Sequence, residues 1–166
     1  MILERRAQTA VWGLLAFMVF IAIGSGLVDI YRLYAARNWG YSVAQEAALV
    51  STSKGRDWDA ITSGGQIRLV ESVARDEAVR LVQAEMMERG IKNFTLDVRV
   101  LPDTNGGSIS GYPPRPVRLG QSLGAWNSDE PAVGIYLSFP VEYVLLDRIG
   151  VVEKSVFVFA SAGVGQ

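Results

Sequence analysis

The 166-residue sequence contains no histidine and no cysteine. Their absence removes the commonest general base, the thiol nucleophile, the usual zinc ligands and any disulfide framework. An excess of charge of one sign is also lacking, because 16 Lys and Arg stand against 17 Asp and Glu. No basic field is available to hold a phosphate backbone, so nucleic acid is not an expected partner.

Motifs that carry chemistry are scarce as well. The pairs Gly64-Gly65 and Gly106-Gly107 lack the spaced third glycine, or the Lys-Ser, of phosphate-binding loops. Asp57 and Asp59 flank Trp58, and two carboxylates beside an aromatic ring could hold a sugar or act as acid and base. Residues two apart in a loop seldom converge, however. A hydrated loop with Trp58 docked on the core explains them equally well.

A partial cation-binding pattern occurs at Asp103-Thr104-Asn105-Gly106. It resembles a fragment of a calcium loop, but the further carboxylates and the closing glutamate are missing. An Asn-Gly turn, which tolerates positive φ, accounts for the same residues. We therefore expect no catalytic, cofactor-binding or metal-binding residues, and no enzyme.

The longest apolar run extends from Ala10 to Val28, 19 residues with no charge and one serine. At about 1.5 Å per residue this run is about 28 Å long as a helix, close to the thickness of a bilayer's hydrocarbon core. It predicts a transmembrane helix. A cleaved signal has a shorter apolar core, and a buried helix of a soluble protein is seldom apolar on every face for five turns.

Polar and aromatic residues mark both ends of this run. Arg5 and Arg6 precede it and favour a cytoplasmic N-terminus. Asp29 and Arg32 follow it and mark the membrane exit. We therefore expect a single pass through the inner (cytoplasmic) membrane, with residues 1–28 as cytoplasmic tip and transmembrane helix, and residues 29–166 as an extracytoplasmic domain.

The helix is expected to continue to about Val50, because residues 29–54 contain no proline and one glycine. Small residues recur every four positions along it and share one face, which allows another backbone to approach closely. This face could pack against the chain's own domain or against another subunit. The candidate helix-packing residues on this face are Ala36, Gly40, Ala44 and Ala48. Ala22 and Gly26 form a similar pair inside the membrane, which could pack against another helix or simply face lipid.

The remainder predicts one amphipathic helix and an antiparallel sheet. Residues 66–89 predict a helix with Gly90 as its C-cap. The apolar side chains at helical spacing are Ile67, Val70, Val73, Ala74, Ala78, Leu81, Val82 and Met86. Alternating apolar and polar residues predict strands at 94–101, 134–146 and 151–160. Pro140 favours an edge position or a bulge for the middle strand.

The segment from Pro102 to Pro131 has no clear periodicity and is long for a connector. It is expected to carry short irregular strands or a contact surface. Together these segments predict an α+β fold: an N-terminal transmembrane helix continuing into a long helix, a second amphipathic helix and a C-terminal antiparallel sheet.

This order of elements is that of a pilin. More narrowly, residues 6–11, the apolar run and the segment from Val28 to Arg37 (VDIYRLYAAR) resemble the TadE-like pseudopilins of tight-adherence (Flp-type) pilus systems, as does the segment from Val141 to Ala162. The resemblance implies a structural or assembly component of a bacterial surface pilus that acts by helix packing and subunit contacts.

The resemblance also implies partners and a role for one carboxylate. The expected partners are membrane lipid, other pilus subunits or a second copy of the chain, and the pilus assembly platform. Glu4 is the candidate for neutralising a neighbour's N-terminus, as pilin glutamates do. The alternative is a membrane-anchored binding or sensor module that does not polymerise, with a pocket lined by Tyr112 and Trp126.

Overall fold

The computed structural model describes residues 2–117, 124–143, 150 and 155–165, with side chains from Val11 onward. The chain divides into two compact units, one made of Met1–Ala35 and Val141–Lys154, the other of Ala36–Pro140 and Ser155–Gln166. Helix α1 (Ile2–Lys54) contributes to both. A single helix running from the apolar segment past Val50 confirms the sequence prediction.

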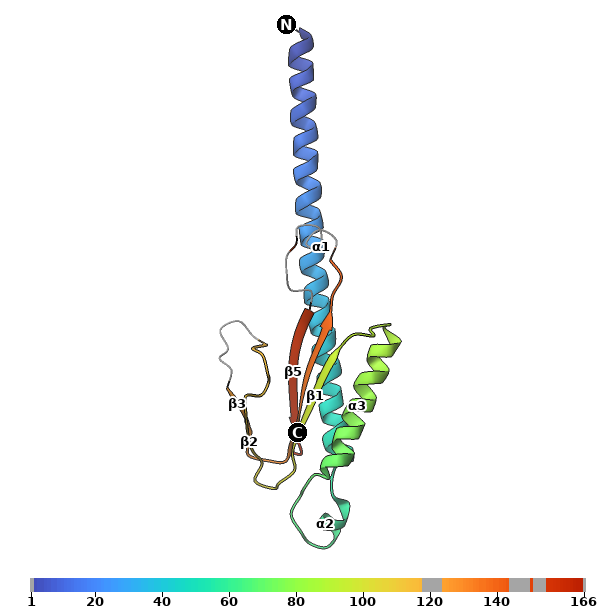
Figure 1. Ribbon diagram of the computed structural model, residues 1–166, viewed down its shortest axis with the longest axis vertical. Helices are drawn as coiled ribbons and strands as arrows, with labels where there is room; N and C mark the ends of the chain where they lie inside the picture. Colours follow the sequence, from blue (N-terminus) through green and yellow to red (C-terminus); the bar gives the residue numbers. More distant parts are fainter. Residues whose placement is uncertain (1, 118–123, 144–149, 151–154, 166) are drawn as a thin grey trace. The chain divides into compact units, whose positions relative to one another are not determined.

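The second unit is an α+β domain, as predicted (Figure 1). The antiparallel sheet has the order β1-β4-β5, from β1 (Thr95–Leu101), β4 (Ala132–Pro140) and β5 (Ser155–Gly163). Two further strands, β2 (Gly107–Ser110) and β3 (Ala125–Ser128), pair with each other. Helices α2 (Trp58–Thr62) and α3 (Glu71–Glu88) lie between α1 and β1 in the sequence.

One face of the three-stranded sheet packs against the C-terminal part of α1. The two approach closely at Gly40, where a Cβ would lie 2.5 Å from the ring of Phe139 and 3.6 Å from Val158. Trp39 lies edge-on to Phe139, with ring centroids 5.4 Å apart. Small residues on the helix therefore let the backbone approach the sheet directly.

The other face of the sheet is covered by the two-stranded β2–β3 arm. Trp126 of β3 packs against Gly134, where a Cβ would come within 3.0 Å of the indole ring. Tyr112 and Phe159 pack edge-to-face, with centroids 5.4 Å apart. The segment from Pro102 to Pro131 thus carries two short strands, as expected, and these strands close a second hydrophobic core.

Helix α3 begins five residues later than the periodicity predicted. Residues 66–70 are extended because Leu69 pairs with Arg56 and donates its N–H to the Pro102 carbonyl, 3.1 Å away. Ile67, Val70 and Val73 are consequently exposed, and the buried face consists of Ala74, Ala78, Val82 and Met86. The helix ends as predicted, since Gly90 adopts φ +71° and Ile91 donates its N–H to the Met86 carbonyl.

Two predictions about the strands and loops are wrong. Strand β4 is central, and Pro140 is its last residue rather than part of an edge strand or a bulge. A missing N–H is tolerated there because the ladder ends at that residue. Trp58 is 57% exposed, so it does not dock on the core. Predicted strand residues 144–146 and 151–154 lie outside the described residues.

Candidate assembly surface

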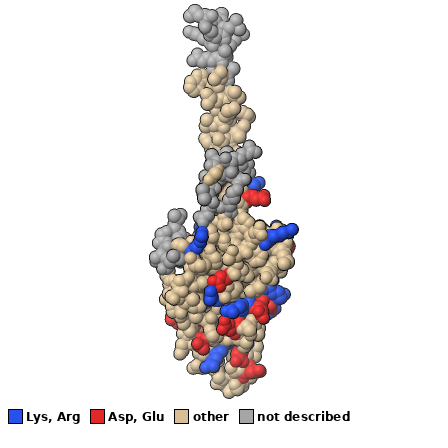
Figure 2. Space-filling model, in the orientation of Figure 1, with Lys and Arg blue, Asp and Glu red and all other residues tan. Residues whose placement is uncertain are grey.

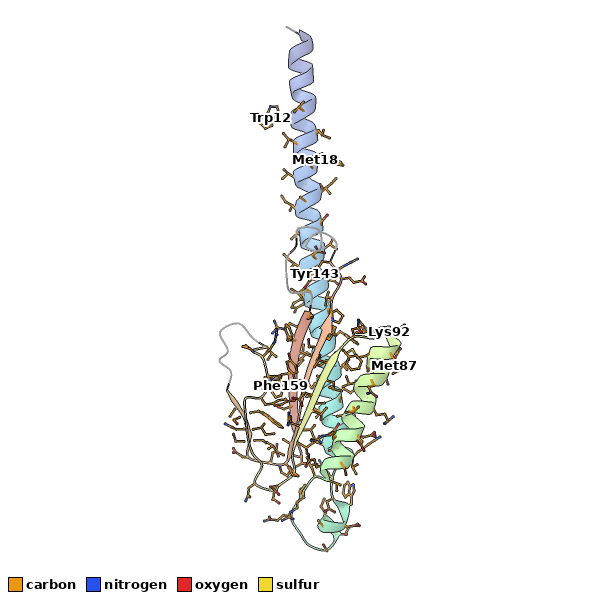
Figure 3. All side chains as sticks on the ribbon, in the orientation of Figure 1. Trp12, Met18, Met87, Lys92, Tyr143 and Phe159 are labelled. Atoms are coloured by element: carbon orange, nitrogen blue, oxygen red, sulfur yellow. The ribbon has the colours of Figure 1, made fainter. Side chains whose placement is uncertain are left out.

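The main candidate surface is the apolar half of α1, in the first unit. Twelve large apolar side chains between Val11 and Val28 are exposed, with fractions from 46% to 75%. Figure 3 shows Trp12 and Met18 on this segment, projecting outward from the helix. The helix is long and apolar enough to cross a membrane, and none of its most apolar window is buried.

Ala22 and Gly26 lie within this exposed segment. Ala22 is exposed and Gly26 is half-buried, and a Cβ at Gly26 would meet no atom of the described residues within 4 Å. Gly24 is equally open but points to the opposite side, because two residues rotate a helix by about 200°. A closely approaching helix could therefore use the Ala22–Gly26 face without displacing any described part of the chain.

The outer small residues have a different environment, in the second unit. Gly40, Ala44 and Ala48 are buried, Ala44 and Ala48 completely, and Ala36 is partly buried. The sequence left open whether this face packs against the chain's own domain or against another subunit. In the structure these residues pack within the chain.

The two predicted membrane-exit residues differ in exposure. Asp29 is completely buried and makes a polar interaction, whereas Arg32 is exposed. The sequence marked Asp29 only as the first charge after the apolar run. Its burial could not be predicted because helical periodicity does not show which face of α1 is covered. Glu4 lies within α1, but its side chain is outside the described part.

Figure 2 shows how charged side chains are distributed over the apolar segment of α1 and over the domain. The described apolar segment carries no Lys, Arg, Asp or Glu from Val11 to Val28. On the visible face of the domain, basic and acidic side chains are interspersed. In each of the described ion pairs of the domain the basic partner is exposed, as in Arg75–Glu71 and Arg99–Asp97. The domain surface is thus suited to water, and the apolar segment is not.

The segments considered as possible acid–base or calcium sites contribute to a helix cap and a turn. Asp57 caps α2 by accepting the N–H of Ala60 through its side chain, at 3.0 Å. Gly106 adopts φ +65° and donates its N–H to the Asp103 carbonyl, which makes the Asn-Gly segment a tight turn. Among the described residues, no group of three or more carboxylates is arranged to hold a metal ion.

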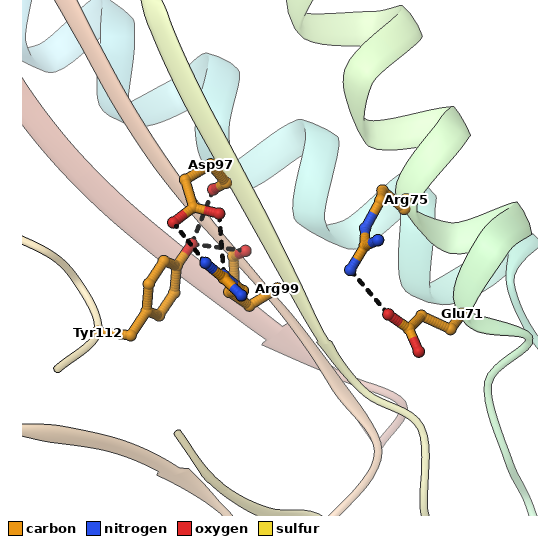
Figure 4. Close-up of polar contacts among 6 residues, drawn as sticks. Glu71, Arg75, Asp97, Arg99 and Tyr112 are labelled. Carbon is orange, nitrogen blue, oxygen red and sulfur yellow. Dashed lines mark hydrogen bonds and ion pairs between the residues drawn. The ribbon is translucent and has the colours of Figure 1, made fainter. Parts of the chain in front are cut away.

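Tyr112 and Trp126 do not form the pocket expected of a binding module. They are 3% and 8% exposed and belong to the core between the sheet and the β2–β3 arm. The Tyr112 hydroxyl lies 2.8 Å from the Asp97 carbonyl and 2.9 Å from the Gly134 carbonyl (Figure 4). Burial, with the nearby Asp97 carboxylate, raises the pKa of Tyr112 well above its usual range. This side chain is a neutral structural donor.

A separate cavity of about 220 Å³ lies beside β5. Arg37, Asn38 and Tyr41 of α1 line it together with β5 residues and Val117, whose carbonyl accepts a hydrogen bond from Arg37. Sequence analysis missed this cavity because its lining combines α1 with residues about 80 to 120 positions away.

The architecture is pilin-like: a long N-terminal apolar helix packs against a C-terminal antiparallel sheet. Comparison with family models, with curated proteins and with solved structures finds no match for this chain.

Proposed function

We propose that this chain is a TadE-like pseudopilin or minor pilin of a tight-adherence type pilus. It is anchored in the cytoplasmic membrane by residues 10–28 and acts by helix packing and subunit contacts. The observation that carries the proposal is the exposure of twelve large apolar side chains on the N-terminal half of a helix whose C-terminal half is buried under an antiparallel sheet.

Such a helix needs an apolar environment. Covering one large apolar side chain is worth about 1.5–3 kcal/mol, so exposing all twelve to water would cost on the order of 20 kcal/mol. Lipid removes this cost for a single chain. In a filament, the same segments from other copies would replace the lipid and add close packing at small residues.

The composition supports a function without covalent chemistry. The chain has neither histidine nor cysteine, the Asp57 carboxylate caps α2, and Asp103 contributes its backbone carbonyl to a turn. Work by packing requires only surfaces, and the Ala22–Gly26 face supplies one at which a Cβ on Gly26 would meet no described atom within 4 Å.

The first experiment locates the native protein. Surface filaments are sheared from cells, and the sheared and membrane fractions are examined by electron microscopy and intact-mass measurement. We expect the chain in sheared filaments, where its mass reports any processing. Recovery from membranes alone, as a monomer or dimer, would contradict a filament subunit and leave an assembly factor or the anchored binding module.

A matched pair of variants tests the helix surface. Gly26→Leu places a bulky side chain on the Ala22–Gly26 face, and Gly24→Leu makes the same change at nearly the same depth on the opposite side. Neither Cβ meets an atom of the described part of the chain within 4 Å, so both variants should fold and insert equally. We expect Gly26→Leu to reduce filament incorporation at least about tenfold, since a bulky residue prevents close helix approach. Equal incorporation of the two variants would exclude this face.

A further inference from the structure

Strand β1 forms one edge of the three-stranded sheet. Its seven residues pair with β4 on one side, from Thr95 with Ser138 to Leu101 with Ala132. No described strand pairs with its other side. An edge of this kind presents unpaired backbone groups unless something covers it.

The side chains and backbone around β1 show which groups face the open edge. The Tyr112 hydroxyl reaches the carbonyls of Asp97 and Gly134 together, so the Asp97 carbonyl points toward β4. Backbone groups alternate along a strand, so those of Leu96, Val98 and Val100 point to the open edge. By the same alternation the carbonyl of Pro102 points to the open edge. It accepts the N–H of Leu69, a residue outside the sheet, as this direction requires.

Helix α3 overhangs this edge and makes a groove. The groove has a volume of about 300 Å³ and is lined by Arg75 and Val79 of α3 and by Leu96 to Arg99 of β1. Figure 4 shows Arg75 and its partner Glu71 on the helix side and Asp97 and Arg99 on the strand side. Leu69 closes one end of the edge, so the open length lies along the groove.

The two faces of β1 differ in chemistry. Asp97 and Arg99 lie on one face, 3.0 Å apart at their closest charged atoms, with 31% and 50% of their side chains exposed. Leu96 and Val98 lie on the other face, next to Val79. A strand added here would place charged residues on one side and apolar residues on the other.

We propose that the β1 edge binds an extended segment of a partner protein, which adds as an antiparallel fourth strand in the groove beside α3. The segment alternates charged and apolar residues and carries a basic residue opposite Asp97 and an acidic residue opposite Arg99. Antiparallel addition continues the pattern of the sheet, and the ion pairs fix the register. Exposed charges at an edge also discourage indiscriminate pairing, which favours a partner with complementary charges.

The sequence of β1 supplies the probe. Thr-Leu-Asp-Val-Arg-Val-Leu is self-complementary when two copies run antiparallel about Val98, because each Asp97 then faces an Arg99. A fluorescent peptide of this sequence with soluble flanks is titrated into the full chain in nanodiscs. The control peptide exchanges Asp and Arg. We expect it to bind roughly tenfold more weakly, because two attractive charge pairs become repulsive.

Backbone methylation tests the geometry separately from the charges. Methylating the peptide N–H that pairs with Val98 should abolish binding, whereas methylating the N–H of its Asp or Arg, which faces away from β1, should leave affinity within about twofold. A second control uses the double variant Asp97→Arg with Arg99→Asp, which should reverse the preference between the two peptides.

The outcomes separate this proposal from its alternatives. Absence of binding, or binding that ignores both peptide charge order and methylation position, overturns it. A chain that is already dimeric in nanodiscs through this edge and takes up no peptide overturns it in favour of a second copy. The comparison of peptides on the unmodified chain needs no variant to fold, and it does not depend on whether α1 assembles into filaments.

Discussion

At the scale of single residues, Gly40 lets α1 approach the sheet closely. A Cβ at this position would lie 2.5 Å from Cε1 and 2.7 Å from Cζ of Phe139. Phe139 is 2% exposed and is also held edge-on by Trp39, so its ring has little room to move. We predict that Gly40→Ala destabilises the domain by about 1–3 kcal/mol, as overpacking does in other cores.

Thermal unfolding of the full chain in detergent measures this effect. Gly26→Ala is the control, because its Cβ meets no atom within 4 Å in the described structure. The same methyl group is added to the same helix, and only its surroundings differ. Equal melting temperatures for the two variants would show that α1 does not approach β4 as closely as Gly40 indicates.

Tyr112 joins the β2–β3 arm to the sheet through one buried hydroxyl. Tyr112→Phe removes the donor to the Asp97 and Gly134 carbonyls and should cost about 1 kcal/mol at neutral pH. Burial raises the pKa of Tyr112 in the folded state, so above about pH 10 the unfolded chain loses this proton first. The contribution of Tyr112 to stability is complete below that pH and falls as pH rises.

The pH dependence provides the measurement. Denaturant unfolding of the native chain and of Tyr112→Phe is compared from pH 8 to 11, and the difference between them isolates this one group. We expect the native chain to lose stability faster than the variant above about pH 10. Parallel curves would mean that the hydroxyl is in contact with water in the folded state.

Sequence patterns at this scale found the small residues but not the aromatic ones. The four-residue spacing of Gly40, Ala44 and Ala48 was visible because helical neighbours are fixed by local geometry. Tyr112 and Trp126 lie in a segment without periodicity, and only the pairing of β2 with β3 brings them onto the sheet. Which aromatic side chains would be buried therefore depended on contacts between distant parts of the chain.

At the scale of elements, the C-terminal end of α1 is tied to α3 by charge. Lys54 of α1 and Arg80 of α3 both bind the Glu77 carboxylate, which is 15% exposed. Hydrogen bonding from Arg80, then from Lys54, lowers the pKa of Glu77 to about 2. The stabilisation from this group is therefore present above the ordinary pKa of about 4.5 and is lost as pH falls toward 2.

Glu77→Gln tests this link between the helices. We expect the variant to melt at a lower temperature than the native chain at pH 7 and the difference to disappear as pH approaches 2. Glu71→Gln is the control, because Glu71 pairs with Arg75 within α3 and is 51% exposed. A difference for Glu77→Gln that stays constant with pH would show that its effect is steric rather than ionic.

Element types were more predictable than element boundaries. Hydrophobic periodicity identified α1, α3 and the three strands of the main sheet, because each buries one face or stripe. The start of α3 was missed because Leu69 is held by the Pro102 carbonyl and by Arg56, contacts that helical spacing cannot show. The central position of β4 was missed because the sequence does not reveal that Pro140 ends the ladder.

At the scale of the whole molecule, apolar surface is distributed unequally between the two units. All the buried apolar residues described lie between Val43 and Val164. The first unit has a buried polar residue, Asp29, and an apolar helical segment that is exposed. Solubility in water and the stability of the core therefore depend on different parts of the chain.

This separation predicts the behaviour of a chain that begins at Ala36. It keeps the part of α1 that packs on the sheet, both cores and the Lys54–Glu77 pair, and it lacks the apolar segment. We expect it to be soluble in water without detergent and to unfold cooperatively, within a few degrees of the full chain in detergent, because nearly all of the described core remains. A variant that aggregates or shows no cooperative transition would mean that the apolar half of α1, or its contacts around Asp29, is needed to form the domain.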